Sequence, residues 1–197
     1  TAFVALINFI IGYVLYKREN IDQTIVFLII GLVLTFVSLI APIQLEGNNI
    51  TLFWAFEAVL LLWLSTKSSI KLLKRAASVI NILMVFSLLV DWIQNYYPNG
   101  EYVDLPIILN KAFITSAIVL GSLACSIKLL KKFEINATLA SFAVKEITVL
   151  LRVTLIIILY LGMLMELNYQ LIDAGFTPSK SMILLGIYNF TFMTILF

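Results

Sequence analysis

Long apolar stretches separated by short polar links run through the whole chain. Each stretch covers roughly 16 to 24 residues, and about 20 are needed to cross the hydrocarbon core of a bilayer. The pattern predicts an all-α fold, a polytopic transmembrane helical bundle forming one region over residues 1–197. About seven membrane segments are expected: 1–16, 24–41, 50–65, 76–93, 107–130, 147–165 and 182–197.

Turn-forming residues mark most of the links between these segments. Pro42 ends the second segment, because proline cannot continue a helix easily. Glu166 to Ser181 is predicted to be a polar link, with turn signals at Asp173-Ala174-Gly175. The placement of 131–146 stays open, since it fits either an early start of the sixth helix or an amphipathic turn in the interface.

The composition excludes an ordinary soluble domain, because 62% of the residues are hydrophobic and only 12% are charged. The basic residues stand at segment ends rather than in one patch, so no nucleic-acid partner is expected. The chain has no histidine and one cysteine, Cys125, which excludes a thiolate cluster and an intrachain disulfide. No phosphate loop, nucleophile elbow or metal-ligand spacing occurs, so we expect no cofactor and no metal, and enzyme function is not favoured.

Lysine and arginine lie mainly on one side of the predicted membrane. That side holds ten of the 13 basic residues: Lys17, Arg18, Lys67, Lys71, Lys74, Arg75, Lys128, Lys131, Lys132 and Lys145. The positive-inside rule makes it cytoplasmic and puts Thr1 outside. Both chain ends lie within apolar runs, so a fragment of a longer chain is expected. Its partners would be membrane lipid and further transmembrane helices of that chain, and its oligomeric state stays open.

Glu57 is the most informative polar residue, because it interrupts the apolar segment 50–65 between Trp54 and Trp63. It follows Ile50 by seven residues, which places it roughly 10 Å into the membrane from the outer side. An unpaired carboxylate there costs several kcal/mol, so it should be protonated, paired or beside water. Two interpretations remain open, a functional group and a buried pair that fixes helix register.

Three other residues lie at a similar depth and are predicted to form a polar cluster with Glu57. Lys111 and Asn110 stand near the outer end of the fifth segment, and Asp91 near the outer end of the fourth. Lys111 is the preferred partner of Glu57. The alternatives are snorkelling of Lys111 to the surface and interface exposure of Asp91.

Three further polar residues lie inside apolar segments. Arg152 is a secondary candidate, some five residues into the sixth segment, and it either snorkels toward Glu146 or lipid phosphate or has a role of its own. Asn81 and Asn189 are expected to form hydrogen bonds between helices.

A short region resembles a known family. The run Pro42-Ile43-Gln44-Leu45-Glu46-Gly47, then Thr51-Leu52-Phe53-Trp54-Ala55-Phe56-Glu57-Ala58, then Leu61-Leu62-Trp63-Leu64, is similar to the uncharacterised bacterial family of large polytopic membrane proteins called domain of unknown function 2339. The resemblance covers about Pro42 to Lys111, and it includes Asn110-Lys111. Ser65 stands where the family usually has glycine. The resemblance implies a bacterial inner-membrane protein with more helices, and no known activity.

Three functions therefore stay open. An assembly module of a larger envelope membrane protein would use Glu57 only to fix helix register, and this hypothesis is ranked first. A transporter or channel-like module would place Glu57 in a polar cavity. A membrane enzyme acting on envelope lipid or glycan would need catalytic groups outside residues 1–197.

Overall fold

The computed structural model of the chain describes residues 29–31, 33, 34, 36, 38, 40, 43–68, 70–96, 106–136 and 141–196. The helices that it describes in full are α3 (Asn48–Ser68), α4 (Lys71–Tyr96), α5 (Lys111–Asn136), α6 (Ser141–Asp173) and α7 (Pro178–Leu196). All five are long and apolar enough to cross a membrane. The all-α membrane class is confirmed for this part of the chain.

Two predicted segments fall partly or wholly outside the described residues. Segment 1–16 lies outside them, as do Lys17 and Arg18. Segment 24–41 is described only in part, and its described residues from 29 to 40 are helical. The total of seven segments remains a prediction, and so does the expectation that the chain is a fragment of a longer protein.

The helix limits correct the sequence prediction at three places. The fifth segment was expected from 107, but 107–110 is not helical and α5 begins at Lys111. The link expected from Glu166 is wrong, because α6 continues to Asp173. The seventh helix begins at Pro178 rather than at 182. Proline suits the first turn of a helix, where its missing N–H leaves no bond unmade.

The link around 131–146 is largely helical. The fifth helix continues to Asn136 and the sixth begins at Ser141, so the sixth helix does start early. Residues 137–140 between them lie outside the described part of the chain.

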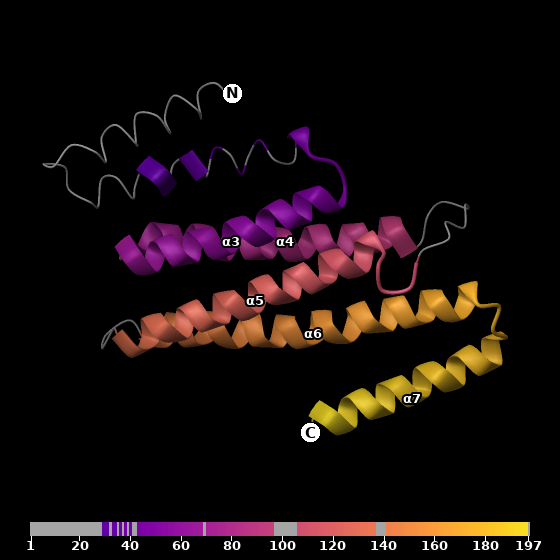
Figure 1. Cartoon of the computed structure of the whole chain (residues 1–197). Coiled ribbons are helices and arrows are strands. Elements are labelled where there is room, and N and C mark those ends of the chain that lie inside the picture. Colours follow the sequence, from indigo (N-terminus) through magenta and orange to yellow (C-terminus); the bar gives the residue numbers. More distant parts are fainter. Residues whose placement is uncertain are drawn as a thin grey trace, which may run out of the picture.

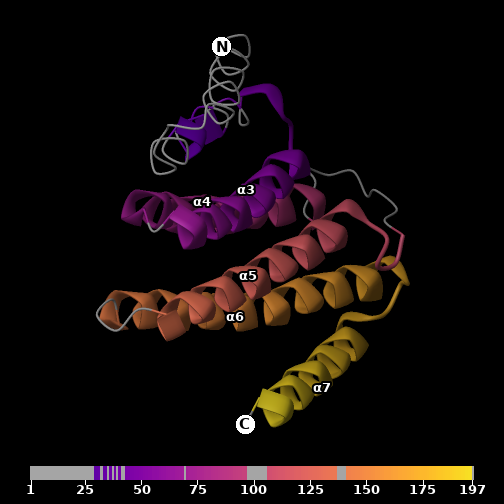
Figure 2. The same cartoon turned by 60° about the vertical axis from the view of Figure 1, so that its left-hand side comes forward.

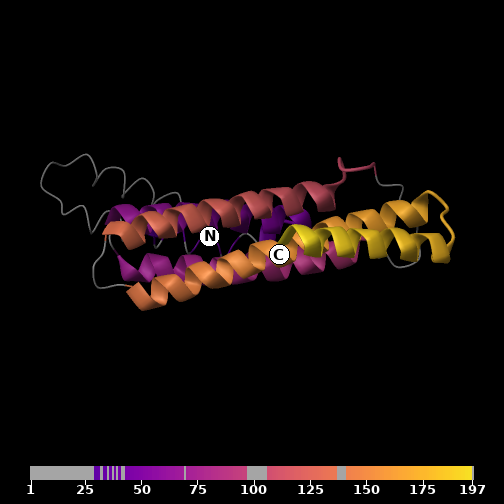
Figure 3. The same ribbon diagram turned by 90° about the horizontal axis from the view of Figure 1, so that it is seen from below.

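The helices lie side by side in two layers, with α3 and α4 in one and α5 and α6 in the other (Figure 1). Seen from below, they form an elongated slab with nearly aligned axes (Figure 3). Successive helices run in opposite directions, so Lys67, Lys74 and Lys128 gather at one end, which we call the basic end. The turn at Pro106–Asn110 and the link at 174–177 lie at the other end, which we call the turn end.

The core lies between α3, α4 and α5. On α3, Ala55 and Ala58 are almost completely buried, and their small side chains allow close helix approach. Met84, Leu88 and Leu123 from the neighbouring helices fill the space against them. Large apolar side chains on the outer faces are exposed, as expected where lipid is the solvent.

Helix α7 stands at the edge of the bundle, where it contacts α6, and its axis diverges from that of α6 toward the C-terminus (Figure 2). Tyr160 on α6 stacks on Tyr188 at 5.8 Å between ring centroids. The Tyr160 hydroxyl donates to Asn189 Oδ1 at 2.8 Å, which confirms that Asn189 bonds between helices. The rest of α7 is mostly exposed.

Candidate functional site

The most connected polar group in the described structure is the Glu166 carboxylate on α6. It is 6% exposed. The Tyr96 hydroxyl and Asn110 Nδ2 donate to its Oε2 at 2.8 and 2.7 Å. The Ile108 backbone N–H and Gln170 Nε2 donate to its Oε1, both at 3.1 Å. The four donors come from α4, from the turn that precedes α5, and from α6 itself. Together they fill the acceptor capacity of one carboxylate.

Asn110 explains why α5 begins where it does. Its Oδ1 accepts a hydrogen bond from the Phe113 N–H at 2.8 Å, which satisfies one of the free donors in the first turn. Its Nδ2 donates to Glu166. One side chain therefore caps α5 and joins that helix to α6.

The backbone just before Asn110 is strained. Ile108 has φ 66°, which is rare for a β-branched residue. The Leu109 N–H donates to the Ile107 carbonyl at 2.7 Å, so Ile108 is the centre of a tight three-residue turn. Its own N–H points at Glu166. A conformation of this kind persists only where the surroundings hold it, and the Glu166 carboxylate supplies that restraint.

A second polar network joins α3 and α4. The Thr51 hydroxyl donates to Asp91 Oδ2 at 2.6 Å and lies 2.6 Å from the Ser87 hydroxyl. Asp91 is 2% exposed, so the alternative that Asp91 is exposed in the membrane interface is wrong. Both networks are made of direct protein hydrogen bonds.

Asparagines extend the α3–α4 network toward α5. Asn95 Nδ2 donates to Asn48 Oδ1 at 3.2 Å and to the Asp91 carbonyl at 2.6 Å. Asn48 Nδ2 donates to Thr115 Oγ1 at 3.1 Å. Deeper in the bundle, Trp92 on α4 donates to the hydroxyl of Ser116 on α5 at 2.8 Å.

The predicted cluster of Glu57, Lys111, Asn110 and Asp91 does not form as one unit. Glu57 is 2% exposed, and within the described ranges neither carboxylate oxygen has a hydrogen-bond partner. Ser38 is the hydroxyl side chain that faces it, without hydrogen-bond geometry. The pairing of Glu57 with Lys111 is therefore not observed.

The reason lies in the helix faces. Lys111 is the first residue of α5 and its side chain is exposed, while its carbonyl accepts from Thr115 at 2.7 Å. Asn110 bonds to Glu166, and Asp91 to Thr51. Depth alone suggested that the four residues meet, but their helices turn them toward different partners.

The remaining candidate residues do not join these networks either. Arg152 is exposed on α6, and its snorkelling toward Glu146 or lipid phosphate stays a prediction. Asn81 is 3% exposed and bonds within its own helix, with Nδ2 donating to the Ala77 carbonyl at 2.9 Å. The expectation that Asn81 bonds between helices is wrong for the part of the chain described.

Glu166 was missed because it was assigned to a polar link. A signal was available in the sequence, since apolar Met165, Tyr169 and Ile172 continue at helical spacing past Glu166. Glu166 and Gln170 stand four residues apart, on one helix face. The described residues contain no group of three or more His, Cys, Asp and Glu side chains placed to hold a metal ion.

Comparison with protein-family models, curated proteins and solved structures gave no match. The resemblance of Pro42 to Lys111 to the domain of unknown function 2339 family stays a prediction. The case for a function therefore rests on the geometry.

Proposed function

We propose that this chain is an assembly module of a larger membrane protein, in which buried hydrogen bonds set the helix register. The observation that carries the proposal is the Glu166 carboxylate, which takes four donors from three parts of the chain. Such a fully satisfied network specifies one arrangement of helices, because a shift of any element leaves buried donors without acceptors. The buried Thr51–Asp91 bond supports the same role between α3 and α4.

The face of the module that would receive further helices is α7. This helix is apolar and mostly exposed, and it is tied to α6 through Tyr160, Tyr188 and Asn189. Transmembrane helices associate through packing and interhelical hydrogen bonds, so an exposed spanning helix at the edge suits a neighbour from the same longer protein. Surrounding membrane lipid would cover what the neighbour leaves open.

The test of this role is assembly of the full-length protein in its native membrane. We expect Glu166→Gln to reduce the folded, assembled fraction several-fold on native gels and to increase its proteolysis. Glu146→Gln is the matched control, because Glu146 is exposed on the same helix. Normal assembly of Glu166→Gln and of Glu166→Ala would refute the role of this network.

One observation favours a second function, transport. Glu57 is a buried carboxyl without a hydrogen-bond partner among the described residues, and an intramembrane ionisable group is a functional candidate by default. If Glu57 fixes helix register, Glu57→Gln lowers folding or assembly. Normal assembly together with loss of a pH-dependent flux into vesicles would replace the assembly role with transport.

We also propose that the basic end is cytoplasmic, as the positive-inside rule predicts. Single cysteines in a Cys125→Ala background test this orientation, because Cys125 is exposed. Lys67→Cys at the basic end should react with an impermeant maleimide only in inside-out vesicles. Ile107→Cys, at a position 68% exposed at the turn end, should react only in intact cells. The opposite pattern would reverse the topology.

A further inference from the structure

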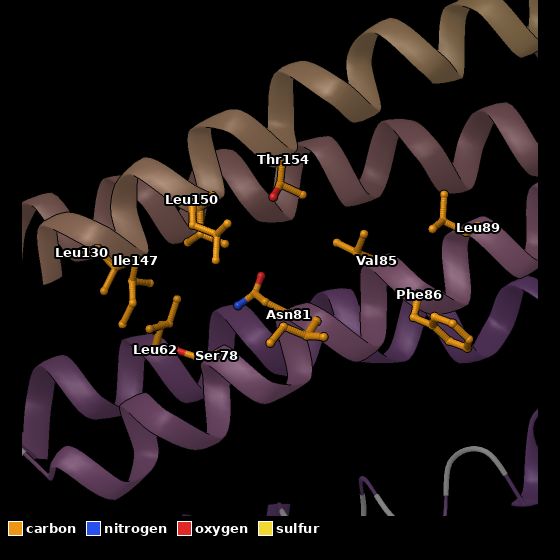
Figure 4. Close-up of a pocket in the computed structure, with 12 residues that line it drawn as sticks. Leu62, Ser78, Asn81, Val85, Phe86, Leu89, Leu130, Ile147, Leu150 and Thr154 are labelled. Carbon is orange, nitrogen blue, oxygen red and sulfur yellow. The ribbon is translucent and has the colours of Figure 1, made fainter. Parts of the chain in front are cut away.

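A lateral groove separates α4 from α6 in the half of the bundle nearer the basic end (Figure 4). Its volume is about 340 Å³. Leu62 and Leu130 from α3 and α5 form part of its wall, and Phe86 and Leu150 stand at its sides. Apolar ligand sites in proteins begin at about 300 Å³, and a dry apolar cavity of about 150 Å³ already takes up benzene. The groove is therefore large enough for a hydrocarbon guest.

One polar atom in this groove has no hydrogen-bond partner within the part of the chain that the structure describes. Asn81 is 3% exposed, and its Nδ2 donates to the Ala77 carbonyl, which fixes which end of the amide is the oxygen. The Oδ1 atom is buried and has no hydrogen-bond partner among the described residues. It points into the groove, and Thr154 on α6 stands on the opposite wall with its hydroxyl oxygen toward the space (Figure 4).

The missing bond defines the chemistry of a ligand. An unsatisfied buried acceptor is costly, so a ligand that offers a hydrogen-bond donor is favoured. A hydroxyl can donate to Asn81 and also accept from Thr154. None of the residues lining the groove is charged, which disfavours a charged headgroup.

The depth of Asn81 along α4 narrows the class of ligand further. Asn81 follows Arg75 by six residues, about 9 Å along the helix axis. Half the hydrocarbon core is about 15 Å, so the amide lies well below the phosphate level. A phosphate headgroup cannot follow a chain to this depth without losing its hydration, whereas a neutral hydroxyl loses little.

We propose that the groove between α4 and α6 binds a neutral lipid alcohol, a long hydrocarbon chain with an uncharged hydroxyl, and that this hydroxyl donates to Asn81 Oδ1. The hydrocarbon chain lies along the apolar walls, and the lipid enters sideways from the bilayer past the exposed Phe86 and Leu150. The site is independent of the Glu166 network, which lies at the turn end.

The experiment is photolabelling of the full-length protein in lipid nanodiscs. The probe is a long-chain alcohol that carries a diazirine on its chain, and labelled peptides are mapped by mass spectrometry. Labelling is expected within 78–89 and 147–154. Unlabelled long-chain alcohol should compete, and the alkane and the methyl ether of the same length should compete about tenfold less, as expected for one hydrogen bond of about 1–2 kcal/mol.

Variants connect the labelling to the geometry. Asn81→Leu keeps the size of the side chain and removes the acceptor, so labelling should fall about tenfold. Asn49→Leu is the control, because Asn49 is exposed at the start of α3, away from the groove, and it should label normally. Leu150→Trp fills the groove and should abolish labelling. If Asn81→Leu fails to fold, Thr154→Val tests the opposite wall and should lower labelling several-fold.

Three results would overturn the proposal. One is equal competition by the alkane and the alcohol, which would show that the groove is an apolar surface without specificity for a hydroxyl. Another is unchanged labelling in both Asn81→Leu and Thr154→Val. The third is a groove that takes no label and in which Asn81→Cys forms a disulfide with another helix of the full-length protein. That result would show that a protein helix, and not a lipid, occupies the groove.

Discussion

Replacement of Glu166 by glutamine tests how far one carboxylate holds the turn end together. Glutamine has the same shape, but one of the two oxygens becomes an NH₂ group that donates. Tyr96 and Gln170 can respond by reorienting, because a hydroxyl rotates and an amide can turn over. The Ile108 N–H and Asn110 Nδ2 cannot, since one is backbone and the other belongs to a side chain whose oxygen caps α5.

The magnitude follows from these two fixed donors. They bind different oxygens of Glu166, so either orientation of the glutamine leaves one of them without an acceptor. One unsatisfied buried donor costs about 1–3 kcal/mol, which is the expected loss in free energy of unfolding for Glu166→Gln. Glu166→Ala leaves both donors unsatisfied and should cost about 2–6 kcal/mol.

Equilibrium unfolding of the full-length protein in mixed micelles, followed by tryptophan fluorescence, measures these differences. Glu146→Gln on the exposed face of α6 should change the unfolding free energy by less than about 0.5 kcal/mol. A double-mutant cycle of Glu166→Gln with Asn110→Ala should give a coupling of about 0.5–3 kcal/mol. A Glu166→Gln variant as stable as the Glu146→Gln control, with no coupling to Asn110, would refute the reasoning.

Three further substitutions are checked by the same unfolding measurement. Ile108→Gly should stabilise the protein by about 1 kcal/mol, because glycine adopts φ 66° without strain, and a loss of stability would show that the side chain contributes packing. Gly175→Ala should destabilise it by about 1 kcal/mol, since Gly175 has φ 70° in the turn that ends α6, and no change would contradict this. Trp92→Phe should cost about 0.5–1.5 kcal/mol through its lost bond to Ser116, and the effect should disappear in a Ser116→Ala background.

The spanning helices could be predicted because a segment that crosses lipid must be apolar along its length, so hydropathy alone nearly suffices to locate it. Residues 50–65 and 76–93 lie inside α3 and α4 as the apolar pattern indicates. The pattern failed at helix ends, where polar side chains form hydrogen bonds inside the protein. Glu166 is polar in the sequence and buried in the structure, because four donors replace the water that it would need elsewhere.

The sequence by itself determined the all-α membrane class and the direction change at each link between the described helices. These follow from length and hydropathy, which need no knowledge of neighbours. Only the tertiary structure decided which polar groups meet, since residues at one depth on different helices share a partner only when their faces turn together. Asn110 therefore binds Glu166, while Glu57 is buried without Lys111.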